Sequence, residues 1–127
     1  MRVVQPPKDD TQLGETSKWL MAGLKALGME IDPEGFLVSW TSGHCKIIVD
    51  AAQVGDDIRS AGLLVIGKKW TQGGTTASLL ELRGDRKAVI EYSLNLASAF
   101  GAERFHYEAE SKNEPGELRR MHEVKVV

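Results

Sequence analysis

The alternation of apolar and polar residues predicts a strand and then a helix at the start of the chain. Residues 2–7 form a short β-prone run that two prolines close. Residues 9–28 place three leucines, Leu20, Leu24 and Leu27, at helical spacing on one face, and Gly28 follows as a stop signal. This second segment is therefore expected to be an amphipathic helix.

The next apolar segment alternates with a period of two. Phe36, Val38 and Trp40 share one parity, a Ser-Gly turn follows at residues 42–43, and residues 46–49 are a β-branched run. We therefore predict a β-hairpin in this part of the chain.

The remaining pattern predicts a second antiparallel pair and a strand–helix–strand unit. The pair covers residues 61–70 and 77–82, which a glycine-rich turn separates. Residues 86–100 are apolar over most of a helical circumference, and residues 103–110 alternate like a half-buried strand. The polar stripe of this predicted helix consists of Lys87, Glu91, Asn95 and Ser98.

This order of elements predicts an α+β fold with a mixed, mainly antiparallel sheet and flanking helices. A helical crossover of this length joins the last two strands in parallel. The 127 residues, of which 42% are hydrophobic, fit one domain over residues 1–127. We expect its C-terminal part, about residues 111–127, to be shortened or irregular.

Charge and cysteine content exclude several classes of function. The net charge of -2 gives no global attraction for nucleic acid or an anionic membrane, so neither is an expected partner. The single cysteine, Cys45, excludes an internal disulfide, and the three histidines are too scattered for a metal site. No apolar run is long enough to span a bilayer, and the N-terminus lacks a secretory layout, so we expect an intracellular, cytoplasmic protein.

Candidate chemistry is concentrated in residues 79–89, which read LLELRGDRKAV. An apolar strand end, a glycine and three basic residues lead directly into the predicted helix. Free N–H groups at a helix N-terminus attract phosphates, and Arg83, Arg86 and Lys87 add positive charge. The alternative is a solvated turn in which Asp85 caps the helix.

The chain resembles the GNAT family of acyl-CoA-dependent N-acyltransferases. The family has a strand, one or two helices, an antiparallel meander, a long helix and a parallel strand. Its cofactor loop reads Arg or Gln, two residues, Gly, one residue, then Gly or Ala. Arg83 and Ala88 match the outer positions of this loop, whereas Arg86 replaces the central glycine.

The resemblance implies acetyl-CoA as cofactor and an amine as acceptor. It places the pyrophosphate on the loop, with Gly84 supplying backbone access, and the pantetheine arm along the preceding strand, where it pairs like an extra strand. The cofactor-binding candidates are Leu79, Leu80, Leu82, Arg83, Gly84, Arg86, Lys87 and Ala88.

Acyl transfer to an amine also needs a base and a proton donor for the thiolate. Glu81 is the candidate base, and Tyr107 or His106 is the candidate acid. The alternatives are a surface role for Glu81 and core packing for Tyr107. Asn113 matches an asparagine that the family carries after this strand, but no tyrosine follows it, and the closing hairpin is shortened or missing.

A second interpretation keeps the fold without turnover. Short GNAT-like chains of this kind resemble ones encoded among the virion genes of tailed phages, which implies a structural or ejection role, a virion location and protein assembly partners. The β-prone residues 123–127 also leave room for an intermolecular sheet and a homo-oligomer. Both interpretations place the chain on the same scaffold.

Overall fold

The computed structural model describes residues 1–69, 74–107 and 122–125, which form an α+β fold around one six-stranded sheet. The strands lie in chain order across the sheet, from β1 to β6. The elements are β1 Arg2–Val4, α1 Asp10–Ala26, α2 Pro33–Thr41, β2 Cys45–Val49, β3 Ala61–Lys69, β4 Gly74–Arg83, α3 Arg86–Ala99, β5 Arg104–Tyr107 and β6 His122–Lys125.

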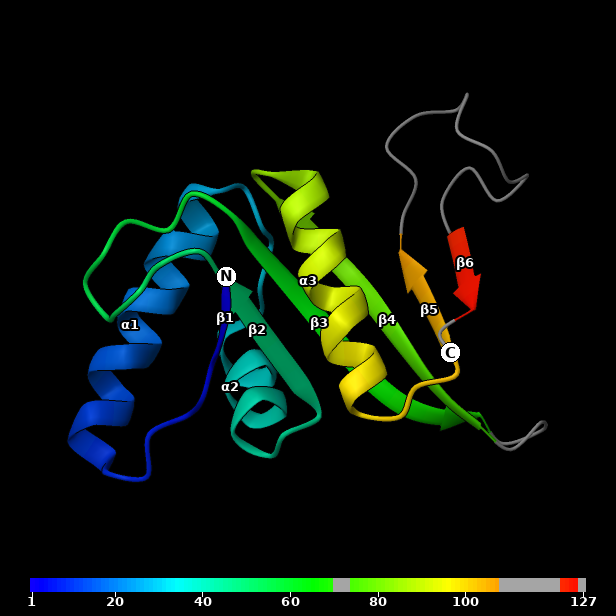
Figure 1. Ribbon diagram of the computed structural model, residues 1–127. Helices are drawn as coiled ribbons and strands as arrows, with labels where there is room; N and C mark the ends of the chain where they lie inside the picture. The colour runs from blue at the N-terminus through cyan, green and yellow to red at the C-terminus, as the bar shows by residue number, and fades with distance from the viewer. Residues whose placement is uncertain (70–73, 108–121, 126–127) are drawn as a thin grey trace.

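The sheet is antiparallel except at one junction. Strands β1 to β4 pair antiparallel in succession, β4 pairs parallel with β5, and β5 pairs antiparallel with β6. Helix α3 makes the crossover between β4 and β5 and lies across the middle strands (Figure 1). The predicted mixed sheet and its parallel strand–helix–strand unit are confirmed.

Helix α1 forms where the sequence predicts it. The Asp9 side chain accepts hydrogen bonds from the N–H groups of Thr11 and Gln12, which otherwise have no intrahelical partner. Leu20 and Leu24 are buried on one face of the helix. Gly28 follows with a φ of 83°, a left-handed conformation that glycine adopts without strain and that ends the helix.

The predicted hairpin over residues 35–49 is wrong in its first half, because Pro33–Thr41 is helix α2. Asp32 caps this helix and Pro33 occupies its first turn, a combination that favours helix initiation. Phe36 and Trp40, four residues apart, are both buried, whereas Val38 is 67% exposed. The apolar residues therefore follow the helical period, and only the turn and strand β2 agree with the prediction.

Each face of the sheet has its own core. Helices α1 and α2 cover one face, here called the α2 face, and Trp40 donates from Nε1 to the carbonyl of Val4 on edge strand β1. Helix α3 covers the other, the α3 face, where its Val89 and Ala97 are fully buried beside Phe105 of β5. A buried strand residue therefore belongs to one core or the other, and that membership shows which face of the sheet its side chain occupies.

Several predictions fall outside the described residues. These are the glycine-rich turn before Gly74, Ala109 at the end of the last predicted strand, Asn113, and most of the C-terminal segment. Strand β6 is described, and it pairs with β5 of the same chain, from Arg104↔Lys125 to Tyr107↔His122. In the part of the chain that the structure describes, no helix is long and apolar enough to cross a bilayer.

Candidate functional site

Strand β4 carries a bulge near its end. Leu64 pairs with Leu79, whereas the preceding residue Leu63 pairs with Glu81, so Leu80 is an extra residue in β4. Leu79 is 2% exposed in the core under α3, and Leu80 is 52% exposed. Leu80 and Glu81 both line a cavity on the α2 face, although adjacent strand residues ordinarily face opposite sides. The bulge therefore places Glu81 on the α2 face.

The pairing between β4 and β5 ends at the same point. The parallel register runs from Thr76↔Arg104 to Leu79↔Tyr107, whereas β4 continues to Arg83. Within the described residues, positions 80–83 of β4 therefore extend beyond the paired part of β5. A strand edge that no other strand pairs with exposes backbone groups that can pair with an extended ligand.

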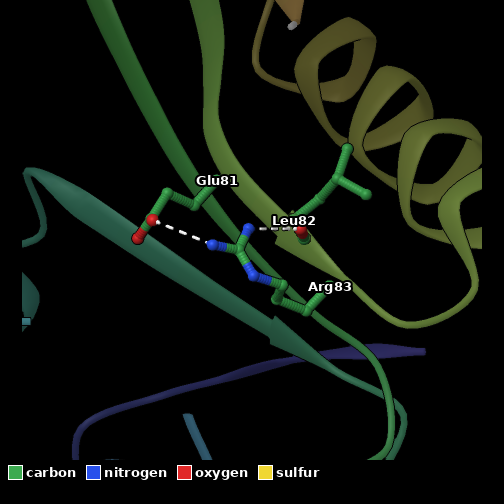
Figure 2. Close-up of polar contacts among 3 residues, drawn as sticks. All are labelled: Glu81, Leu82 and Arg83. Carbon is green, nitrogen blue, oxygen red and sulfur yellow. Dashed lines mark hydrogen bonds and ion pairs between the residues drawn. The ribbon is translucent and has the colours of Figure 1, made fainter. Parts of the chain in front are cut away.

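Arg83 turns back along β4 toward Glu81 (Figure 2). Its Nη2 lies 3.6 Å from Oε1 of Glu81, and its Nη1 donates to the carbonyl of Leu82 at 2.8 Å. The two side chains of the ion pair are 39% and 28% exposed, so solvent screens the pair and another charged group can replace either partner. Leu82 itself is half-buried against the core of the α3 face.

Gly84 is required by a neighbouring loop. Its φ is 85°, and a Cβ at this position would overlap the Arg59 carbonyl oxygen and the Ser60 side chain. Ser60 is 5% exposed, and its Oγ accepts a hydrogen bond from the Asp85 N–H at 2.9 Å. Ser60 therefore fixes the start of α3, a role that nothing in the local sequence pattern indicates.

Asp85 caps helix α3, as the alternative interpretation of this stretch requires. Its Oδ1 accepts from the Ala88 N–H at 3.2 Å, so that amide already has a partner. The first two residues of the helix are Arg86 and Lys87, and the first turn contains no acidic residue. Two cations at the positive end of a helix dipole are unfavourable unless an anion is near, and Asp85 is one such anion.

Of the two candidate acids, only Tyr107 lies on the opposite face of the sheet from the candidate base, Glu81. Tyr107 pairs with Leu79 and packs against the core of the α3 face, with the Arg86 guanidinium carbon 5.7 Å from its ring centroid. Glu81 lies on the α2 face, so the structure brings Tyr107 together with Arg86 and not with Glu81. His106 pairs with Ser78, three residues before Glu81 along β4, and shares the face of Glu81.

Cys45 sits in the floor of the cavity that Glu81 lines, but it does not have the properties of a nucleophile. The side chain is 6% exposed, and burial raises the pKa of its thiol to about 11, against a smaller lowering by Lys46. His44 next to it is exposed. The thiol is therefore neutral near pH 7.

The residues around the β4 edge fit an acyl-CoA in part. Three parts of the described chain suit a polar arm that ends in phosphates: residues 80–83 of β4 beyond the described pairing with β5, the first turn of α3, and the three basic side chains. Two features oppose this fit. Asp85 adds a negative charge, and the side of Gly84 on which a Cβ would lie faces Ser60 and not a ligand. The fit depends mainly on Arg83, Arg86 and Lys87.

No protein-family model matches the sequence, and no curated protein matches it significantly. Solved structures do match. A probable acetyltransferase aligns with a TM-score of 0.57 at 15% identity, covering 91% of this chain and 83% of its own. An aminoglycoside acetyltransferase from an uncultured soil metagenomic sample, in complex with sisomicin, aligns with a TM-score of 0.54 at 13% identity, covering 82% of this chain and 72% of its own. A tetramutant of a Bacillus halodurans protein aligns with a TM-score of 0.51 at 12% identity, covering 82% of this chain and 78% of that protein.

The chain therefore has the α+β fold of the GNAT-type acetyltransferases.

Proposed function

We propose that this protein is an acyl-CoA-dependent N-acyltransferase that binds its cofactor along the end of β4. The observation that carries the proposal is the coincidence of three features among the described residues: the bulge at Leu80, the last described β4–β5 pair at Leu79, and the basic first turn of α3. In the described part of the chain, they place the end of β4, beyond its pairing with β5, next to a concentration of positive charge. The fold shared with acetyltransferases is consistent with this assignment.

The backbone of residues 80–83 is assigned to the amide-bearing arm of the cofactor, which pairs with it like an added strand. The phosphates are assigned to the N-terminus of α3, where Arg86 and Lys87 supply charge-assisted hydrogen bonds. Arg83 is the third cation, and it exchanges its weak ion pair with Glu81 for a phosphate. Leu79 is buried under α3, so its side chain anchors this part of β4 in the core of the α3 face.

In the proposed reaction, the bound cofactor supplies the acyl group as a thioester, the amine nitrogen bonds to the acyl carbon, and the carbon–sulfur bond breaks. Glu81 accepts, directly or through a water, the proton that the amine loses. Tyr107, which lies on the other face of the sheet beside Arg86, would donate a proton to the departing thiolate. Base and acid therefore approach the end of β4 from opposite sides.

A calorimetric titration with acetyl-CoA, and separately with desulfo-CoA, tests the binding step. Arg86→Ala should weaken binding by about 1–3 kcal/mol, the usual size of a charge-assisted hydrogen bond. Asp85→Asn should strengthen binding, because asparagine still caps the helix while the negative charge is lost. Lys18→Ala is the matched control, since it removes one positive charge from an exposed position on α1. Equal affinity in all four proteins would contradict the assignment.

The separation of Glu81 from Tyr107 favours a second candidate function, a non-catalytic protein that uses the fold for assembly, including a virion-associated component. A release assay for the CoA thiol, with a panel of primary amines, distinguishes the two. Thiol release that Glu81→Gln abolishes supports the acyltransferase. Binding of the cofactor without release of the CoA thiol in the presence of any of the amines supports the assembly role.

A further inference from the structure

The loop between β2 and β3, residues 50–60, is closed at its base by its own hydrogen bonds. The Asp50 N–H donates to the carbonyl of Ser60 at 3.2 Å, and the Asp50 carboxylate accepts from the Arg59 N–H at 3.0 Å. The Asp56 carboxylate accepts from a backbone N–H inside the loop at 3.2 Å. These bonds tie the loop into a compact unit, as in an Ω-loop, so a displacement of one part reaches the others.

Helix α1 supports the far part of this loop, which projects from the sheet toward the helix (Figure 1). Nε1 of Trp19 donates to the carbonyl of Asp56 at 2.8 Å. The Ile58 side chain packs so closely on Gly23 that a Cβ on this glycine would lie 2.7 Å from Cδ1 of Ile58. Helix α1 is in turn fixed to the sheet through its buried face, so it provides a rigid support for the loop.

The base of the loop reaches the start of α3. The Ser60 hydroxyl accepts from the Asp85 N–H at 2.9 Å, and Gly84 fits against the backbone of the loop because it has no Cβ. Only 5% of Ser60 is exposed, so its hydroxyl is held in place by its neighbours. Asp85 caps α3 directly before Arg86 and Lys87. A shift of Ser60 therefore moves the first turn of α3 and the two cations on it.

We propose that loop 50–60 positions the start of α3 on the support of α1, and that Ser60 is the positioning residue through which the loop acts. The inference rests on the proposed function in one respect, because it takes the first turn of α3 as the part that receives the cofactor phosphates. The contacts lead from α1 to the far part of the loop, and from Ser60 to the Asp85 amide. A substitution on α1 that displaces the loop therefore alters the phosphate site without touching it.

Two alanine substitutions on α1 perturb the loop from a distance and supply a matched control. Gly23→Ala forces Ile58 to move, and the displacement should reach Ser60. Gly14→Ala adds the same methyl group to the same helix, at a position where no atom lies within 4 Å of it. Only the first variant should therefore alter the start of α3.

The two indole hydrogen bonds give a second pair. Trp19→Phe removes the bond from α1 to the loop, whereas Trp40→Phe removes the same kind of bond, 2.9 Å long, from α2 to the carbonyl of Val4. A general loss of stability affects both variants, so only a connection through the loop separates them. Ser60→Ala removes the acceptor of the Asp85 N–H directly and completes the set.

The first readout needs no cofactor: it is the chemical shift and the hydrogen-exchange rate of the Asp85 amide in ¹⁵N-labelled protein. Ser60→Ala should move this amide proton upfield and speed its exchange by about fivefold, because its hydrogen bond is lost. Gly23→Ala and Trp19→Phe should speed the exchange by about threefold, and their controls by less than about 1.5-fold. The second readout is the Kd for CoA, which should rise in the same order.

Each outcome decides the matter. Equal effects within each pair, or an Asp85 amide that Ser60→Ala leaves unchanged, would overturn the inference. An Asp85 amide that responds as expected in a protein that does not bind CoA would leave Ser60 as the positioning residue of α3 and would remove the proposed function. CoA affinity that is equal in all five variants and the unsubstituted protein would leave the cofactor assignment standing and would remove this one.

Discussion

The contact between Gly84 and the segment before β3 allows a prediction of stability with a matched control. Gly84 has a φ of 85° and Gly101 a φ of 76°, so alanine at either position enters the left-handed region. That conformation costs an ordinary residue about 1–2 kcal/mol. At Gly101 no atom lies within 4 Å of the added Cβ, so this is the whole expected loss for Gly101→Ala.

At Gly84 the added methyl would also overlap Arg59 and Ser60, which must shift. Overpacking of this kind costs about 1–3 kcal/mol, so Gly84→Ala should lose about 2–5 kcal/mol in all. Urea unfolding followed by far-ultraviolet circular dichroism measures both losses, provided that the slope m stays unchanged. Equal losses for the two variants, within about 0.5 kcal/mol, would refute the claim that Gly84 is fixed by Ser60.

Three further predictions test individual elements. Ser93→Ala should raise the free energy of unfolding by about 1 kcal/mol, because the Ser93 hydroxyl is buried without a hydrogen-bond partner in the described structure; a loss in urea unfolding would mean that it has one. Asp32→Ala should cost about 1 kcal/mol and Asp32→Asn much less, since either acid or amide caps α2; equal losses would argue against the cap. Cys45 should react slowly with a thiol reagent in the native protein at pH 8 and rapidly in urea, and fast labelling of the native protein would contradict its burial. Because burial raises the pKa of this thiol to about 11, the free energy of unfolding should fall as the pH rises toward that value.

The first and last helices, α1 and α3, could be predicted because the sequence signals that define them are local. Caps, leucine spacing and terminal glycines define α1 and α3 within a few residues. The missed helix α2 also had a local signal, the Asp32-Pro33 pair, but Phe36, Val38 and Trp40 fit a strand period over five residues as well. The exposure of Val38 decides between the two periods, and a sequence does not contain it.

The site depends on long-range pairing, which the sequence does not reveal. The apolar run at 79–80 continues without a break, and only the register with β3 shows that Leu80 is an extra residue and that Glu81 faces α2. The role of Gly84 likewise comes from Ser60, which is remote in the sequence. The sequence locates the charged side chains along the chain, but tertiary contacts decide which groups lie next to them.

The most direct test of the central claim is a titration of the ¹⁵N-labelled protein with CoA, followed by amide chemical shifts. We expect shifts concentrated at residues 80–88, with Lys18 and the rest of α1 unchanged as an internal reference. Arg86→Ala should reduce those shifts at equal CoA concentration. No shift at millimolar CoA, or shifts confined to α1 and α2, would contradict the assignment of the β4 edge as a cofactor site.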